Sequence, residues 1–212
     1  MDTCNAALRF GSRVALGEET TVSPAAEATL QSMLRGNEEF RTHSRNLASL
    51  SAAIRHKTAH EGQHPYAVVV CCADSRVPAE HIFTAGIGDL FVIRNAGNLM
   101  TPAALGSVEY AVAHLHVPLV LVMGHRGCGA VAAAMMDHLE LGALGDLIDQ
   151  VADNIVHASS PRQAEFKNMR ASLAELGRSE VLRKLAAEGR VGFAGAIYDL
   201  SGGRVELALE DV

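Results

Sequence analysis

Two continuous apolar runs of strand length limit what this chain can fold into. Residues 66–71 and 118–123 have the sequences YAVVVC and PLVLVM, and neither contains a charged residue. Strands that are apolar at almost every position are typical of parallel sheets covered by helices on both faces. The rest of the chain alternates between strand patterns, near 89–94 and 191–199, and helical patterns such as 102–115 and 130–157. We therefore expect an α/β fold with a mostly parallel central β-sheet and flanking helices.

Both ends of this core have further elements. Residues from Ser23-Pro24 to Phe40 carry apolar side chains at helical spacing, which predicts an N-terminal helical arm packed on this domain or on a neighbouring subunit. Residues 191–200, Ser201-Gly202-Gly203 and 205–209 form a strand, turn and strand pattern. An antiparallel edge strand near the C-terminus is expected from this pattern.

Length and composition favour one domain, because 212 residues with 49% hydrophobic content can bury a single sizeable core. We predict a flexible N-terminus over residues 1–23 and one domain, including the arm, over 24–212. The net charge of −6 comes without a basic cluster, which argues against nucleic acid as a partner. The apolar runs are too short to span a bilayer, and residues 1–23 lack the pattern of a secretory signal, so we expect a cytoplasmic protein without a membrane partner.

Side chains that bind metals follow both apolar runs. Cys72 comes directly after the first run, and His125 and Cys128 follow the second. Because chemistry in parallel α/β sheets gathers at the carboxyl ends of the strands, and glycines around His125 allow a tight turn, these three residues are expected to converge. Two sulfurs and one imidazole nitrogen leave a fourth tetrahedral position open, as in catalytic zinc sites. Cys4, the remaining cysteine besides Cys71, is expected to lie in a mobile terminus.

The residues after Cys72 include a carboxylate and a guanidinium that could lie beside a bound metal without being its ligands. If the backbone stays extended, Cys72, Asp74 and Arg76 share one face and Cys71 points away. Arg76 can then hold Asp74 ionised through a bidentate pair, as a fixed acceptor beside the metal. In isolation the same pattern is an ordinary surface ion pair. Its weight comes from the second motif at His125 and Cys128.

Taken together and in this order, the motifs resemble those of the β-class carbonic anhydrases over about residues 25 to 209. The matching segments are Leu34-x-Gly36-Asn37-x-x-Phe40, Cys72-x-Asp74-x-Arg76, Gly88-Asp89-Leu90-Phe91-Val92-x-Arg94-Asn95-Ala96-Gly97-Asn98 and His125-x-x-Cys128-Gly129. The resemblance implies a lyase that reversibly hydrates CO2 to bicarbonate and a proton by attack of zinc-bound hydroxide. It further implies one Zn2+ per chain on Cys72, His125 and Cys128, with Asp74 and Arg76 as the catalytic dyad.

The resemblance also implies a narrow substrate pocket that is partly built by the neighbouring subunit. Its residues would be Gln63, Phe91, Tyr110 and Gly129, with Gln63 donating to an oxygen of CO2 or bicarbonate and the two aromatic rings forming the wall. Judged without the resemblance, Phe91 and Tyr110 are ordinary core residues. A shared pocket implies a homodimer, or a tetramer of such dimers.

Some members of the family are regulated by bicarbonate, and their Asp can move onto the zinc. Their accessory site uses Trp and Gly where this chain has Val69 and Cys71, and the chain contains no Trp. We therefore expect the open form, with water as fourth ligand and Asp74 paired to Arg76.

The two thiolates would cancel the charge of the zinc ion, so the ion would lower the pKa of its bound water less. We therefore expect an alkaline activity optimum.

Other interpretations remain open at this point. A related COS or CS2 hydrolase, or an inactive zinc-binding or redox-sensing homologue, would share the metal site. A nucleotide-binding module is suggested by Gly124, Gly127 and Gly129, although their spacing is of neither the dinucleotide nor the P-loop type. The ten histidines include no residue that the sequence marks as a proton shuttle.

Overall fold

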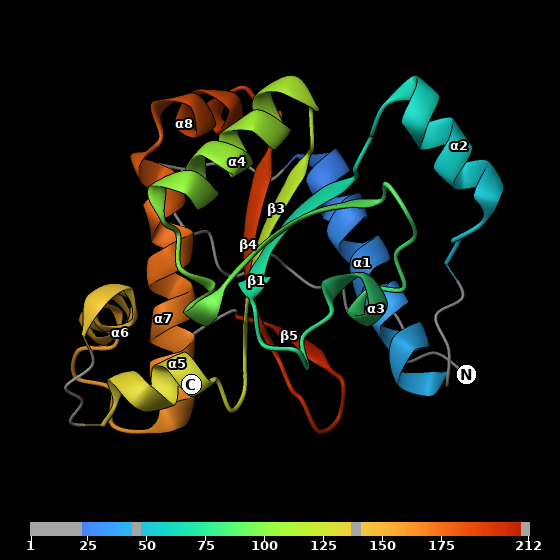
Figure 1. Ribbon diagram of the computed structural model, residues 1–212. Helices are drawn as coiled ribbons and strands as arrows, with labels where there is room; N and C mark the ends of the chain where they lie inside the picture. Colours follow the sequence, from blue (N-terminus) through green and yellow to red (C-terminus); the bar gives the residue numbers. More distant parts are fainter. Residues whose placement is uncertain (1–22, 44–47, 137–140, 209–212) are drawn as a thin grey trace, which may run out of the picture.

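The computed structural model describes residues 23–43, 48–136 and 141–208, and its centre is a twisted sheet of five strands (Figure 1). The strand order is β2-β1-β3-β4-β5, and β1 to β4 are parallel whereas β5 is antiparallel to β4. The strands are β1 Ala67–Cys72, β2 Leu90–Asn95, β3 Leu119–His125, β4 Gly192–Tyr198 and β5 Val205–Leu207. The predicted fold class and the C-terminal edge strand are confirmed.

The pairing register decides which residues meet at the carboxyl edge of the sheet. β1 and β3 are neighbours, and Cys71 pairs with Met123. The next residues, Cys72 and Gly124, therefore lie at the same level, one residue before His125. All positions of β1 and β3 are buried, as expected of central strands.

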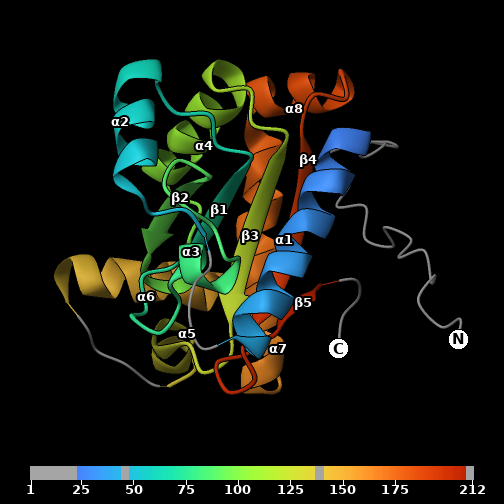
Figure 2. The same cartoon turned by 90° about the vertical axis from the view of Figure 1, so that its right-hand side faces the viewer.

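Helices cover both faces of the sheet (Figures 1 and 2). On one face, α1 runs along β3 and β4, and the short α3 lies beside it. On the other face, α4, α7 and α8 bury a second apolar layer that includes Val108, Met169 and Leu182. The helices are α1 Pro24–Thr42, α2 Ala52–Glu61, α3 Ala79–Ile82, α4 Pro102–His114, α5 Gly129–Ala134, α6 Gly142–Asn154, α7 Pro161–Glu175 and α8 Glu180–Ala187, with 3-10 turns at Ala96–Asn98 and Leu176–Arg178.

The N-terminal arm, helix α1, packs on its own domain. Ser23 caps it by accepting a hydrogen bond from the Ala26 N–H at 3.2 Å. The buried Asn37 donates to the carbonyls of Ile82 and Gly203 at 3.2 and 2.8 Å and accepts from the Val205 N–H at 2.9 Å. At Gly36, an added Cβ would lie 2.1 Å from the Phe83 carbonyl oxygen. The Leu34-x-Gly36-Asn37-x-x-Phe40 motif thus contains residues that dock this helix.

Two features of the helical layer differ from the sequence prediction. The helical pattern over 130–157 forms two helices, because α5 ends at Ala134 and α6 begins at Gly142, whose φ of +66° does not fit a helix interior. Helix α7 was not predicted, because it buries the polar residues Glu165, Asn168 and Ser172, which weaken the apolar periodicity.

Some predictions concern residues beyond the described ranges. Residues 1–22 of the predicted flexible N-terminus, Cys4 among them, lie outside the described part. Within the described part, none of the helices is long and apolar enough to cross a membrane.

Candidate metal centre

Three buried side chains converge at the carboxyl edge of the sheet. Cys72 ends β1, His125 ends β3, and Cys128 immediately precedes α5. Their possible ligand atoms all lie within 4.8 Å of one another. Between His125 and Cys128, Gly127 has a φ of +66°, which turns the chain back toward the cluster. The structure thus brings together the three residues that the sequence identified as candidate metal ligands.

The donor set fits a zinc ion. The His125 ring is 1% exposed, and its Nε2 has no hydrogen-bond partner, although an unpaired buried polar atom is costly. Its Nδ1 is 2.9 Å from the Arg126 carbonyl oxygen, which can only accept, so Nδ1 carries the proton and Nε2 presents a lone pair. Two cysteine sulfurs and this nitrogen are ligands that zinc prefers, and they leave one tetrahedral position open.

The surroundings of the two cluster cysteines shift their pKa values in opposite directions. The hydrogen bond from the Cys128 thiol lowers the pKa of Cys72 despite burial, and the same bond is the main cause that raises the pKa of Cys128. Burial lowers the pKa of His125, but the nearby Cys72 sulfur raises it more, so the net shift is upward. Of the two sulfurs, Cys72 is therefore the one whose ionised form the site favours.

Asp74 and Arg76 form a bidentate pair beside the cluster. Arg76 Nε donates to Asp74 Oδ1 at 2.9 Å, and its terminal nitrogen donates to Oδ2 at 2.7 Å. These bonds hold the pKa of the Asp74 carboxyl well below its usual range. Asp74 Oδ2 also lies 4.0 Å from His125 Nε2, so the carboxylate faces the same space as the ligand atoms.

The pair forms through a turn that begins at Asp74, so the condition of an extended backbone as far as Arg76 is not met. The Val77 N–H donates to the Asp74 carbonyl at 3.0 Å, and the Arg76 N–H donates to the Asp74 side chain at 2.9 Å. A carboxylate that accepts from the backbone two residues on stabilises such a turn. The sequence analysis brought Asp74 and Arg76 together through side-chain alternation along an extended strand. In the structure, the turn at Asp74 brings them together instead.

Arg94 fixes the end of β1, a function that sequence reasoning missed. Its Nε donates to the Cys72 carbonyl at 3.1 Å, and its terminal nitrogen donates to the Asp74 carbonyl at 2.7 Å. Arg94 was recognised as part of a motif, but its partners are 20 and 22 residues away. Only the parallel pairing of β1 with β2 brings them together.

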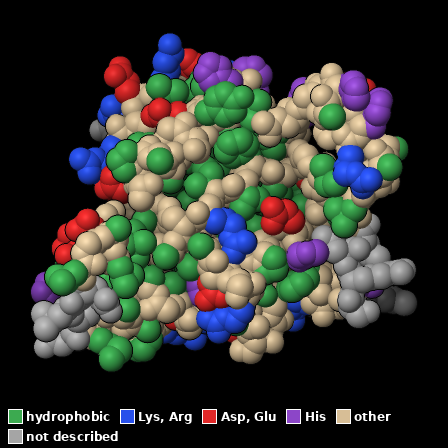
Figure 3. All heavy atoms as spheres, in the orientation of Figure 1, with side chains coloured by type: hydrophobic (Ala, Val, Ile, Leu, Met, Phe, Trp, Pro, Cys, Tyr) green, Lys and Arg blue, Asp and Glu red, His purple; other side chains and the backbone are tan. Residues whose placement is uncertain are grey.

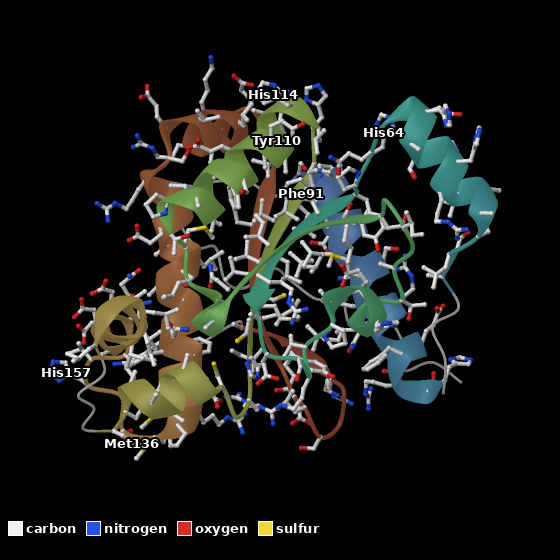
Figure 4. The ribbon with its side chains drawn as sticks, viewed as in Figure 1. His64, Phe91, Tyr110, His114, Met136 and His157 are labelled. Atoms are coloured by element: carbon white, nitrogen blue, oxygen red, sulfur yellow. The ribbon has the colours of Figure 1, made fainter. Side chains whose placement is uncertain are left out.

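The predicted pocket residues Gln63, Phe91 and Tyr110 do not meet the cluster of their own protomer. Phe91 is level with Val68, four residues before Cys72, which places it about 13 Å away along the strand. Figure 4 shows Phe91, Tyr110 and His114 together at the opposite end of the sheet. The Phe91 and Tyr110 ring centroids are 6.3 Å apart, and Tyr110 is 48% exposed. Gln63 is exposed just before β1, whereas Gly129 directly follows Cys128.

Known proteins share this fold and this sequence pattern. The family model of the carbonic anhydrases matches residues 67–205. Carbonic anhydrase 2 of Mycobacterium tuberculosis is 38% identical over 190 residues, which cover 85% of this chain and 91% of that protein. The carbonic anhydrase of Mycolicibacterium smegmatis is 40% identical over 163 residues, which cover 72% of this chain and 79% of that protein.

Solved structures agree with these relatives. A Coccomyxa β-carbonic anhydrase in complex with acetazolamide superposes with a TM-score of 0.65 at 27% identity, covering 74% of this chain and 78% of that one. A tetrameric β-carbonic anhydrase from Sordaria macrospora superposes with a TM-score of 0.64 at 26% identity, covering 74% of this chain and 91% of that one. The family match, the two mycobacterial relatives and the shared fold show that this chain belongs to the β-class carbonic anhydrases, a family of lyases.

Proposed function

We propose that this chain hydrates CO2 reversibly to bicarbonate and a proton, using one zinc ion held by Cys72, His125 and Cys128. The observation that carries the proposal is the convergence of the three buried ligand atoms next to Asp74. Family membership supports the same reaction.

A zinc ion held by these three residues would lower the pKa of a coordinated water and so supply a nucleophile. The two thiolates would weaken this effect, because they neutralise the charge of the ion. Asp74 is the residue that orients this nucleophile, because an ionised carboxylate can only accept hydrogen bonds. By accepting the O–H of the nucleophile it turns an oxygen lone pair toward the carbon of CO2. Arg76 occupies both carboxylate oxygens and keeps Asp74 charged and in place. We accordingly propose the open form, in which Asp74 remains with Arg76.

We propose that a second copy of the chain completes the substrate pocket. Gln63, Phe91 and Tyr110 of that copy would lie beside Gly129 and the metal ligands of the first. The separation between these residues and the cluster within one protomer supports this arrangement, as does the exposure of Tyr110. A homodimer is the smallest assembly that satisfies it.

Exposed apolar surface supports association. Hydrophobic side chains are visible over α5 and α6 (Figure 3). Met136, shortly after α5, and Leu141, just before α6, are 69% and 89% exposed. Patches of this kind mark contact surfaces.

We also propose a cytoplasmic location for this chain. The free thiols of Cys71, Cys72 and Cys128 support it, because thiols stay reduced in that compartment.

Zinc stoichiometry measured together with stopped-flow CO2 hydration tests the proposal. We expect about one zinc per chain and a rate that rises toward alkaline pH. Zinc-replete protein that hydrolyses COS or CS2 but does not hydrate CO2 would identify a related hydrolase instead. Zinc without any of these activities would indicate an inactive homologue, and a bound nucleotide without zinc would indicate a nucleotide-binding module.

A further inference from the structure

Glu165 is a buried carboxylate that binds the loop between two of the candidate metal ligands. The residue belongs to α7 and is 6% exposed. Its Oε1 accepts from the Gly127 N–H at 2.7 Å, and its Oε2 accepts from the Arg126 guanidinium at 3.1 Å. Burying a carboxylate away from water costs free energy unless hydrogen bonds or an opposite charge compensate for it, and these two donors do so. Both partners lie between His125 and Cys128.

The Arg126 contact connects Glu165 to the His125 ring. The Arg126 carbonyl accepts the Nδ1–H of His125 at 2.9 Å, so the position of Arg126 sets the direction of Nε2. Arg126 is also held at its backbone, where its N–H donates to the Tyr198 carbonyl at 2.9 Å. The ring is thereby oriented by a residue that Glu165 and β4 fix from two sides.

The Gly127 contact acts on the other half of the loop. Gly127 has a positive φ and no side chain, so it has more backbone freedom than other residues. Glu165 holds its N–H, and Arg76 donates to its carbonyl oxygen at 3.2 Å. The residue before Cys128 is therefore held on one side by α7 and on the other by Arg76.

We propose that Glu165 is a positioning residue of the metal centre. Its carboxylate fixes residues 126–127 so that His125 Nε2 and Cys128 Sγ converge on Cys72 before a metal arrives. The inference rests on the proposed function for the identity of the ion, and it assigns Glu165 no contact with substrate. Hydrogen-bond partners behind metal ligands typically change metal affinity by about 10–100-fold.

The competing explanation is that Glu165 only anchors α7 to the sheet. However, α7 already packs on the sheet through Phe166, Met169 and Leu173, which belong to the apolar core. A purely anchoring role predicts lower stability with an unchanged metal site. A positioning role predicts a changed metal site in a folded protein.

Glu165→Ala, Glu165→Gln and a control on the same helix, Glu175→Ala, separate these roles. Glu175 forms an ion pair with the exposed Arg178 at 3.2 Å, at the far end of α7 from Glu165. For each protein we would measure the zinc release rate to a chelator and the visible absorption of the cobalt(II)-substituted form, which reports ligand geometry. Far-UV circular dichroism checks the fold.

We expect Glu165→Ala to release zinc about 10–100-fold faster than the wild type and to change the cobalt spectrum. Glu165→Gln should fall between, because its amide oxygen still accepts from Gly127 while its NH2 faces the Arg126 guanidinium. Glu175→Ala should match the wild type.

Unchanged zinc release and cobalt spectra in the Glu165 variants would overturn the proposal, as would equal effects of Glu165→Ala and Glu175→Ala. If Glu165→Ala does not fold, the nearly isosteric Glu165→Gln decides by the same two measurements. A wild type that holds zinc but does not hydrate CO2 would defeat the proposed function and leave this comparison valid.

Discussion

Cys71 and Cys72 are consecutive residues of β1, yet their side chains lie on opposite faces of the sheet. Cys71 packs in the apolar layer under α1 with Val69 and Met123, whereas Cys72 lies with Leu99 and Cys128. Burial raises the pKa of Cys71 to about 12, which keeps it a neutral thiol. Side chains alternate between the two faces of a strand, so only one of two consecutive cysteines can face the cluster. In β1 that residue is Cys72.

Serine substitutions at these two positions should have different effects. Cys72→Ser should lower the zinc content far below one per chain, because a sulfur ligand is lost. Cys71→Ser should retain zinc and destabilise the protein by about 1–3 kcal/mol, because it buries a hydroxyl in an apolar layer. Zinc analysis after gel filtration and urea unfolding measure the two effects. Equal zinc loss in both variants would contradict the assignment of Cys72.

Asp74→Asn should retain zinc and lose about 100-fold or more in CO2 hydration. The amide cannot accept through both of its polar atoms, so it orients the nucleophile less well and no longer matches Arg76. Stopped-flow kinetics and zinc analysis on the same sample measure both quantities. A variant with the wild-type rate would remove Asp74 from the proposed mechanism.

The Asp74–Arg76 pair should contribute to stability in a pH-dependent way. The bonds from Arg76 lower the pKa of Asp74 in the folded state. The contribution is therefore fully present above the unfolded-state pKa of about 3.9 and is lost as the pH falls toward the folded-state value. Urea unfolding of the wild type and Asp74→Asn should show a stability difference that is constant from pH 7 to pH 5. The difference should decrease below about pH 4, and one that grows in acid would have the wrong sign.

Two glycine substitutions test how α1 docks. Gly36→Ala should destabilise the protein by about 1–3 kcal/mol or more, because its Cβ would lie 2.1 Å from the Phe83 carbonyl oxygen. Gly106→Ala on α4 is the control, since its added Cβ would meet no atom within 4 Å beyond its chain neighbours and the backbone of its own helix. It should be neutral or stabilise by up to about 1 kcal/mol. Chemical denaturation of both variants measures the difference, and similar stabilities would show that α1 does not need this close approach.

Much of the fold and of the candidate site could be predicted because the signals are local. The apolar runs that end near Cys72 and His125 require buried strands, and parallel strands bring their carboxyl ends together. The C-terminal hairpin follows from its glycine turn. The division of 130–157 into two helices and the presence of α7 were missed, because Gly142 and the buried polar residues of α7 contradict simple periodicity.

The sequence by itself determined which atoms can bind a metal and which strands present them, because residue type and strand periodicity depend only on neighbouring residues in the chain. Only the tertiary structure decided how those atoms are held. The partners of Arg94 and Glu165 lie 20 to 39 residues away, and the turn at Asp74 replaces the extended backbone that alternation suggested. Such contacts depend on the packing of β2 and α7 against the sheet, and packing depends on the whole chain at once.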